Sequence, residues 1–150
     1  MPKRSIETMV GALTLHQNHN AIAALTWEAG ASDETTLLFE AEHQLRAYFS
    51  GDLNSFNLPL EVSGGPLQKA VCDAMLNIPL GETRTYGDLA RELNRPAQAV
   101  GRACGGNPIP VIIPCHRIVG ANSLGGFSGG TGIETKVALL KHEGAAGLLI

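Results

Sequence analysis

The stretch "TYGDLARELNRPAQAVGRACGGNP", residues 85–108, contains two short helical patterns separated by a proline. Thr85 and Asp88 have the spacing of a capping box, with Asp in place of the usual Glu or Gln. Pro96 can open a second helix over residues 97–105, which is rich in Ala and Gly. Two short helices joined by a tight turn are what a helix-turn-helix motif needs. Many other helical hairpins have the same pattern, so both interpretations stay open.

The segments around this stretch predict further elements. Residues 33–50 favour an amphipathic helix with acidic residues in its first turn, and the segments around 9–15 and 21–27 are candidate strands. Residues 57–66 contain Pro and Gly and are a candidate linker, followed by a predicted helix from Pro66 to Ile78. Residues 111–114 favour a buried strand or extended segment, and the glycine-rich residues 119–132 favour a loop. A last helix is expected to bury a face formed by Ile133, Val137 and Leu140.

Composition and charge limit the class of protein. The chain has the composition of a globular protein, and no apolar stretch approaches the ~20 residues of a membrane span. Residues 1–65 carry three basic and eight acidic side chains, whereas residues 66–150 carry eight basic and six acidic ones. Any polyanionic partner is therefore expected at the C-terminal part. The odd number of widely spaced cysteines, with no secretion signal expected, indicates reduced thiols in a cytoplasmic protein.

Cys115 allows three interpretations. A metal site needs about four ligands in short spacings, and this pattern is absent around the three cysteines, so no metal is expected. Cys72 and Cys104 are expected to be buried structural thiols. Cys115 is flanked by His116 and Arg117, and cationic neighbours lower the pKa of a thiol. An adjacent histidine can act on the thiol only through a water or in a non-helical turn. The residues alone leave nucleophile and structural thiol equally open.

The segment "NPIPVIIPCHRIV", residues 107–119, resembles the active-site signature of the O6-alkylguanine-DNA alkyltransferases, the methylated-DNA–protein-cysteine methyltransferases. Residues 44–61, 78–90 and 125–144 are similar to three other segments of that family, in the same order. The resemblance covers about residues 44–144. It implies an α/β N-terminal domain with a small sheet over 1–62. A mostly helical C-terminal domain with a helix-turn-helix is implied over 63–150.

The function implied by this resemblance is direct reversal of DNA damage. An alkyl group, typically methyl, would pass irreversibly from O6-alkylguanine in double-stranded DNA to Cys115, with O4-alkylthymine as a second candidate substrate. The protein would act once, as a monomer without cofactor, flipping the base out from the minor groove. His116 would take the thiol proton through a water, Glu143 would orient His116, and Tyr86 would donate from its phenol to the flipped guanine. Asn107 would hold the turn before Cys115.

The resemblance also places two groups of residues around the DNA and the base. The residues expected to contact DNA are Tyr86, Gly87, Arg95, Ala97, Gln98, Ala99, Gly101, Arg102 and Arg117. The residues expected to line the base pocket are Val119, Gly126, Phe127 and Ser128. Simpler interpretations stay open for three residues: Asn107 before proline is a common turn residue, Glu143 can be a solvated helix-end charge, and Tyr86 can be a packing residue.

One departure from the family pattern concerns base extrusion. The family has an arginine nine residues before the Asn, where this chain has Gln98. Our hypothesis is that Gln98, or Arg102 one turn later, takes over this role with weaker extrusion or DNA affinity. The alternative function is an alkyltransferase-like protein that recognises damage with weak or no transfer, although such proteins replace the acceptor cysteine. A Cys–His hydrolase is the third hypothesis, and no distant histidine has a recognisable context for it.

Overall fold

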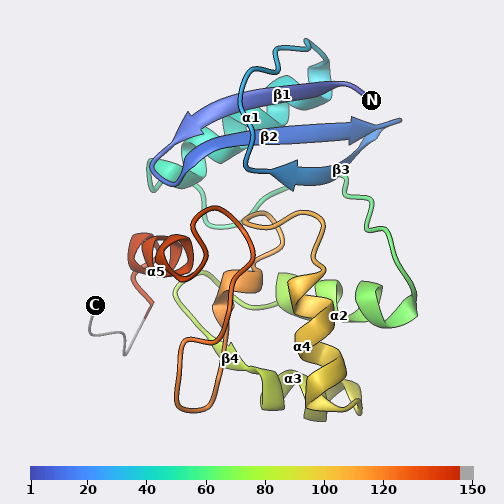
Figure 1. Cartoon of the computed structure of the whole chain (residues 1–150). Coiled ribbons are helices and arrows are strands. Elements are labelled where there is room, and N and C mark those ends of the chain that lie inside the picture. Colours follow the sequence, from blue (N-terminus) through green and yellow to red (C-terminus); the bar gives the residue numbers. More distant parts are fainter. Residues whose placement is uncertain (146–150) are drawn as a thin grey trace. The chain divides into compact units, whose positions relative to one another are not determined.

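The computed structural model describes residues 1–145, which fall into two compact units, Met1–Glu61 and the residues from Val62 onward (Figure 1). The first unit is a small sheet with one helix, and the second is mostly helical. The predicted fold class is therefore confirmed. Among the described residues, no helix is both long and apolar enough to cross a membrane.

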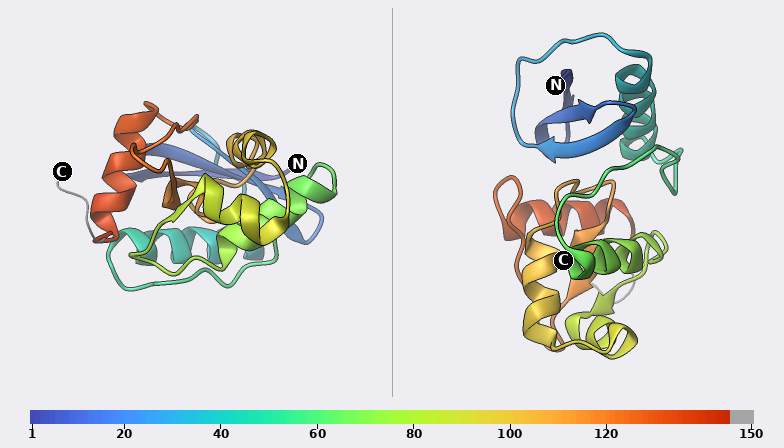
Figure 2. Two further views of the ribbon diagram at one scale, coloured as in Figure 1. Left: turned by 90° about the horizontal axis from the view of Figure 1, so that it is seen from below. Right: turned by 90° about the vertical axis from the view of Figure 1, so that its right-hand side faces the viewer.

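The first unit is built on an antiparallel sheet of order β1-β2-β3. Its strands are β1 (Lys3–Thr8), β2 (Gly11–Asn18) and β3 (Ala21–Thr26). The two candidate strands correspond to β2 and β3, whereas β1 was not predicted because Ile6 is its one strongly apolar residue. Helix α1 (Thr36–Phe49) packs along one side of the sheet against β1 and β2 (Figure 2). The helix buries Leu38, Ala41, Leu45 and Tyr48.

The start of α1 differs from the prediction. The Thr35 hydroxyl caps the helix by accepting the Leu38 N–H at 3.0 Å, so the helix begins at Thr36. Asp33 and Glu34 therefore lie before the first turn, and the prediction of acidic residues in that turn is wrong. Thr35 is a preferred N-cap residue, and its hydroxyl satisfies one of the amides left free at a helix start.

In the described part of the second unit, up to residue 145, the chain forms four α-helices and a pair of two-residue parallel strands. The elements are α2 (Pro66–Leu76), β4 (Arg84–Thr85), α3 (Tyr86–Leu93), α4 (Ala97–Gly105), β5 (Ile118–Val119) and α5 (Ile133–His142). Helices α2, α3 and α4 pack against one another (Figure 1). Helix α4 has the predicted bounds, and α2 begins at Pro66 as predicted but ends two residues before Ile78.

The connection between α3 and α4 is a tight turn. The capping box at the start of α3 is complete: Thr85 Oγ1 accepts the Asp88 N–H at 3.0 Å, and Asp88 Oδ2 accepts the Thr85 N–H at 2.9 Å. At the end of α3, Asn94 adopts the left-handed conformation with φ 53°, and Pro96 precedes α4. Asn tolerates this conformation better than most residues, so the chain reverses within three residues.

The predicted strand over 111–114 is wrong, although these residues are buried as expected. The chain forms a tight turn in which the Ile113 N–H donates to Ile109 O at 2.8 Å, and Val111 has φ 73°. A β-branched residue in the left-handed region is strained, and such strain concentrates at functional sites. Asn107 imposes the turn, because its side chain accepts the Ile109 N–H and donates to Ile113 O at 2.8 Å.

Helix α5 buries Leu140 as predicted but not the other two residues of the predicted face. Ile133 is 43% exposed and Val137 is half-buried, whereas the buried residues are Thr135, Lys136, Leu139 and Leu140. The buried face includes Lys136, which a prediction from apolar residues alone assigns to the solvent side. The Lys136 ammonium donates to backbone carbonyls, and these bonds compensate for the removal of its charge from water.

Candidate active site

Cys115 begins a 3₁₀ turn, Cys115–Arg117, directly after the strained turn. Its backbone N–H donates to Ile113 O at 2.8 Å. The Asn107 side chain also lowers the pKa of the Cys115 thiol, because its amide group favours the thiolate. Asn107 therefore holds the turn, as expected, and in addition favours ionisation of the thiol that the turn presents. Cys115 is partly exposed, whereas Cys72 and Cys104 are buried.

The Cys115 side chain lines a cavity of about 320 Å³. The residues around the cavity are Tyr86, Gly101, Cys104, Gly105, Cys115, Gly126, Phe127 and Ser128. Three of the four predicted pocket residues lie there, namely Gly126, Phe127 and Ser128. Val119 does not, because it belongs to β5, where it pairs with Thr85. The contribution of α4 through Cys104 and Gly105 was not predicted, although positions 101, 104 and 105 share one helix face.

His116 is fully buried and is held by Glu143. Its Nε2–H donates to Glu143 Oε2 at 2.7 Å, which leaves Nδ1 as the acceptor nitrogen of a neutral ring. Burial lowers the pKa of His116, although the Glu143 carboxylate opposes this shift, so the neutral ring is favoured. His116 Nδ1 is buried and has no hydrogen-bond partner among the described residues. The histidine is thus arranged to accept a proton at Nδ1.

Arg117 does not lie on a DNA-facing surface, which corrects the prediction for this residue. It is 6% exposed, and its guanidinium donates to both carboxylate oxygens of Glu143 at 2.9 Å and to Ile78 O at 2.6 Å. A buried guanidinium needs such partners, because an uncompensated charge in the interior is very costly. Arg117 therefore fixes the carboxylate that orients His116. Glu143 is correspondingly buried, and it is not a solvated helix-end charge.

The ionisation of Cys115 also differs from the expectation. Burial raises the pKa of the Cys115 thiol, whereas the Asn107 hydrogen bond and the Lys136 charge lower it by smaller amounts. The adjacent residues do not supply the expected cationic effect, because neutral His116 is favoured and Arg117 is paired with Glu143. The resting thiol is therefore protonated at neutral pH and needs a base before it can attack.

Tyr86 is the first residue of α3 and faces the cavity. Burial raises the pKa of its phenol, and the nearby Gly126 N–H lowers that pKa by a smaller amount. The phenol is thus a donor at neutral pH. Gly125 lies against it with φ 74°, and a Cβ at this position would come within 2.9 Å of Tyr86 Oη. The loop can approach the phenol this closely only with glycine at position 125.

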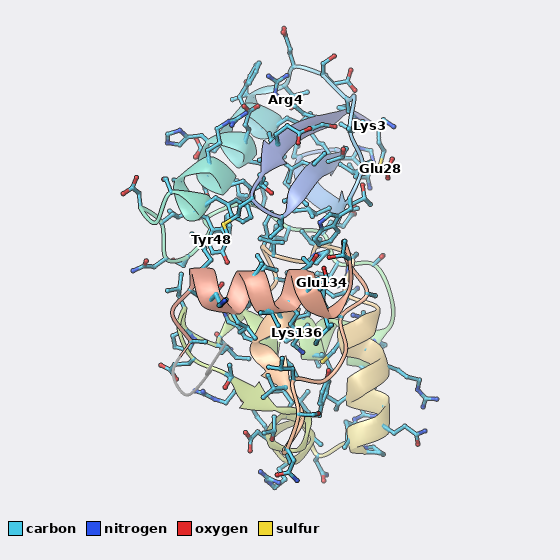
Figure 3. All side chains as sticks on the ribbon, turned by 60° about the vertical axis from the view of Figure 1, so that its left-hand side comes forward. Lys3, Arg4, Glu28, Tyr48, Glu134 and Lys136 are labelled. Carbon is cyan, nitrogen blue, oxygen red and sulfur yellow. The ribbon has the colours of Figure 1, made fainter. Side chains whose placement is uncertain are left out.

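Lys136 is a site residue that the sequence did not reveal. It is fully buried on α5, where Figure 3 labels it, and its Nζ donates to Ile118 O at 2.5 Å and to Gly126 O at 3.1 Å. Burial lowers its pKa to about 8, and its charge favours the Cys115 thiolate. The residue connects the start of the glycine-rich loop to its middle, next to the residues that line the cavity. Its spacing to Leu139 and Leu140 could have indicated its place on the buried face.

Several residues expected to contact DNA lie on the outside of α4 and the turn before it. Arg95, Ala97, Gln98 and Arg102 are exposed. Arg102 borders a separate hollow formed with α2, together with Leu67, Gln68, Ala99 and Ala103. Gly87, in the first turn of α3, is half-buried. Within residues 1–145, no group of three or more His, Cys, Asp or Glu side chains is placed to bind a metal ion.

The geometry defines a class of site: a cysteine that lines a small cavity and is followed directly by a buried histidine–carboxylate pair. Comparisons identify the family. The family model of the 6-O-methylguanine DNA methyltransferase DNA binding domain matches residues 66–145, and that of the ribonuclease-like domain matches residues 1–62. The chain belongs to the 6-O-methylguanine DNA methyltransferase family.

Individual relatives agree with this assignment. The methylated-DNA–protein-cysteine methyltransferase of Methanosarcina acetivorans is 48% identical over 109 residues, 71% of this chain and 69% of that protein. The protein of the same name from Mycobacterium tuberculosis is 40% identical over 151 residues, 93% of this chain and 90% of its own. A crystal structure of the M. tuberculosis O6-methylguanine methyltransferase has a TM-score of 0.84 at 36% identity, covering 99% of this chain and 96% of that one. A structure of M. tuberculosis OGT in complex with DNA also has a TM-score of 0.84, at 39% identity, covering 95% and 93% of the two chains.

Proposed function

We propose that this chain repairs DNA by direct reversal, moving the alkyl group of O6-alkylguanine irreversibly onto Cys115. One observation carries the proposal: the Cys115 thiol lines a cavity and is followed by a buried histidine whose acceptor nitrogen has no partner within residues 1–145. Glu143 fixes that histidine from its other nitrogen. The names of the relatives and the DNA complex of one of them support a DNA substrate.

The reaction begins with removal of the thiol proton. His116 Nδ1 accepts it through a bridging water, since adjacent residues in a 3₁₀ turn do not stack directly. The thiolate sulfur attacks the alkyl carbon and forms a thioether as the bond between that carbon and guanine O6 breaks. The electron pair of this bond stays with guanine, which then takes up one proton. Tyr86 donates a hydrogen bond to the guanine ring and stabilises its developing negative charge.

Binding of DNA is assigned to α3 and α4, which act as a helix-turn-helix in the minor groove. The exposed residues at the start of α4 approach the duplex, and the target base turns out of the stack into the cavity. Gln98 is the better candidate for filling the space that the base leaves, because it is exposed and lies one turn before Gly101, which lines the cavity. Arg102 borders the hollow against α2 and serves the phosphate backbone. The protein acts as a cytoplasmic monomer.

Mass spectrometry tests this function. The full chain is incubated with a duplex containing O6-methylguanine, digested, and mapped, with Cys115→Ser as the matched control. The expected result is one methyl group on the peptide containing Cys115 and none in the control variant. Transfer to another residue, or repeated turnover by one molecule, would contradict the proposal.

A second candidate is damage recognition with weak or no transfer, and the observation that favours it is Gln98 in place of the family's arginine. The same experiment separates the two functions. Tight binding of the alkylated duplex without an adduct on Cys115 would support recognition alone. Transfer from the free base O6-methylguanine but not from duplex DNA would place the defect in base extrusion.

A further inference from the structure

The groups around the Cys115 thiol are also those that a cysteine hydrolase needs. Such a site requires a thiol, a base that accepts its proton, a group that orients the base, and a hydrogen-bond donor for an oxyanion. Cys115 is followed by His116, whose Nδ1 is buried and has no hydrogen-bond partner within residues 1–145. Glu143 Oε2 accepts from the other ring nitrogen at 2.7 Å. The thiol, the base and the orienting group are therefore present.

Tyr86 supplies the donor. Its phenol lines the same cavity as Cys115, and burial raises its pKa, so the hydroxyl keeps its proton at neutral pH. Ser128 is the other hydroxyl residue in the lining, and its Oγ donates to Gly105 O at 3.5 Å. A carbonyl oxygen bound in the cavity can therefore accept a hydrogen bond from Tyr86.

The water that connects the thiol with His116 has a second use. In the proposed transfer this water carries the thiol proton to His116 Nδ1, because neighbouring residues of the 3₁₀ turn do not stack directly. When the sulfur carries a bound group, a water at the same place touches His116 Nδ1 and adjoins the atom bonded to the sulfur. His116 is then positioned to activate this water against the group that Cys115 carries.

The bond formed on the sulfur decides whether that water can react. In a thioether the carbon is saturated and a thiolate leaves it very slowly, so an alkyl group stays on Cys115. In a thioester the carbon belongs to a carbonyl group, which water attacks readily, and the thiolate leaves from the resulting tetrahedral intermediate. The same residues should therefore act once on an alkyl donor and repeatedly on an acyl donor.

We propose that the Cys115 site also hydrolyses small aryl esters of short carboxylic acids, with repeated turnover. The cavity of about 320 Å³ lies near the lower end of small-molecule sites, roughly 300–1,000 Å³, which limits the activity to small esters. The reaction uses the same thiol as the proposed alkyl transfer, and it needs neither DNA nor a base turned out of the stack. It therefore goes beyond the proposed function.

The reaction converts one ester and one water into one carboxylic acid and one phenol. His116 accepts the thiol proton through the water, and the thiolate sulfur attacks the carbonyl carbon. The oxyanion that forms accepts a hydrogen bond from Tyr86, and its electron pair then restores the carbonyl and expels the phenolate, which takes the proton from His116. In the second half, His116 accepts a proton from water, the hydroxide attacks the thioester carbon, and the carbon–sulfur bond breaks. The Cys115 thiolate recovers the proton as the acid leaves.

The test uses p-nitrophenyl acetate and measures the release of p-nitrophenol by the full-length chain at neutral pH. Cys115→Ala gives the background, since exposed amines and histidines react slowly with the same ester. We expect the wild type to release many equivalents of p-nitrophenol per chain, at a rate about tenfold or more above that of Cys115→Ala.

Three further variants assign the steps. His116→Gln should slow the release by about 100-fold and leave acetylated Cys115 detectable by mass spectrometry after acid quenching, because the base for the second half is lost. Tyr86→Phe removes one hydroxyl and should also slow the release by about 100-fold; it keeps the test valid if His116→Gln does not fold. Cys72→Ala removes a fully buried thiol that does not line the cavity and should keep the wild-type rate.

Three results would overturn the inference: equal release by the wild type and Cys115→Ala, undiminished release by both His116→Gln and Tyr86→Phe, or one equivalent released with a stable acetyl group left on wild-type Cys115. Methyl transfer from duplex DNA, measured on the same preparation, separates the two functions. Acyl turnover without methyl transfer would refute the proposed function alone. Methyl transfer without acyl turnover would refute this inference alone.

Discussion

At the scale of single residues, the site depends on the Glu143 carboxylate, which accepts hydrogen bonds from two neighbouring side chains. One carboxylate accepts from the His116 ring and from the Arg117 guanidinium, and all three side chains are buried. The arrangement fixes the histidine tautomer, because a carboxylate can only accept. It also explains why Arg117, adjacent in sequence to a reactive segment, has a structural role and does not contact DNA.

Replacing Glu143 by Gln should separate orientation of His116 from its basicity. Burial lowers the pKa of His116 below its ordinary value of 6.5, and the Glu143 carboxylate raises it. Neutral His116 is the base, so transfer should decline only below about pH 6.5 in the wild type. In Glu143→Gln the decline of the transfer rate at acid pH should begin at a still lower pH, because the carboxylate that raises the pKa of His116 is gone. The pH-independent rate above this decline should fall about tenfold or more. Transfer rates from free O6-methylguanine between pH 4.5 and 8 measure both effects. A lower pH-independent rate without a shift of the acid decline would argue against a role of Glu143 in the basicity of His116.

Replacing Arg117 by Met should destabilise the protein strongly. The change leaves the Glu143 carboxylate buried without its cation, and breaking a buried pair costs about 3–5 kcal/mol. Urea denaturation measures the free energy of unfolding. Arg91→Met is the matched control, since Arg91 is 76% exposed in its pair with Asp88 and should show no measurable cost. Equal stability of Arg117→Met and the wild type would contradict the structural role.

At the scale of elements, the glycine-rich loop and α4 enclose the cavity from different parts of the chain. Lys136 fixes the loop by donating to the carbonyls of Ile118 and Gly126, and the neighbouring Gly125 lies against the Tyr86 phenol. The loop thereby positions the phenol assigned to the leaving guanine. Its glycines are required where the backbone meets that phenol.

Gly125→Ala should displace Tyr86 and slow alkyl transfer. The new Cβ would lie 2.9 Å from Tyr86 Oη, and the backbone at φ 74° disfavours any residue with a Cβ. We expect the rate from free O6-methylguanine to fall about tenfold or more, because a displaced hydrogen-bond donor no longer stabilises the leaving group. Gly65→Ala, where the added Cβ meets nothing within 4 Å, should keep the wild-type rate. A rate unchanged in Gly125→Ala would show that Tyr86 is not held by this loop.

Substitutions on α4 should reveal which residue extrudes the base. Gln98→Ala should slow repair of duplex DNA more than transfer from the free base, because only duplex substrate needs extrusion. Gln98→Arg should speed duplex repair by adding a cation that can enter the base stack. Arg102→Ala should mainly weaken DNA binding and reduce its salt dependence. Single-turnover rates on duplex and free base measure these effects, and no change in any of the three variants would refute the assignment to this helix face.

At the scale of the whole molecule, the reaction is expected to alter the stability of the protein. The thioether formed on Cys115 places an extra group at the end of a tightly packed turn whose residues are buried. Overpacking of such a site typically costs about 1–3 kcal/mol. The melting temperature of the alkylated chain should therefore be lower than that of the unmodified chain, measured on the same preparation before and after reaction. An unchanged melting temperature would count against this expectation.

The sequence by itself determined the local features of this protein. Residues such as Thr85, Asp88 and Pro96 specify helix starts through contacts within one turn, so α3 and α4 were predicted close to their observed bounds. The segment around Cys115 indicated the family and predicted Cys115 as the acceptor, because ordered sequence motifs can be matched without knowing any distance in the structure. The strand predicted over 111–114 was wrong because Asn107 folds that segment through side-chain bonds that no periodicity reveals.

Only the tertiary structure decided which side chains are buried together, because burial depends on elements that are distant in the chain. It placed Arg117 against Glu143, 26 residues away, and so removed it from the DNA contacts. It placed Lys136 against the glycine-rich loop, where it bonds to Gly126 O, and it brought Cys104 and Cys115 to one cavity. The spacing of these residues in the sequence predicted neither arrangement. The tertiary structure also reversed the expected pKa shift of the acceptor thiol, since desolvation outweighs the favourable charges around it. The motif around Cys115 predicts this residue as the acceptor. Its need for a base follows from the structure, because burial raises the pKa of its thiol.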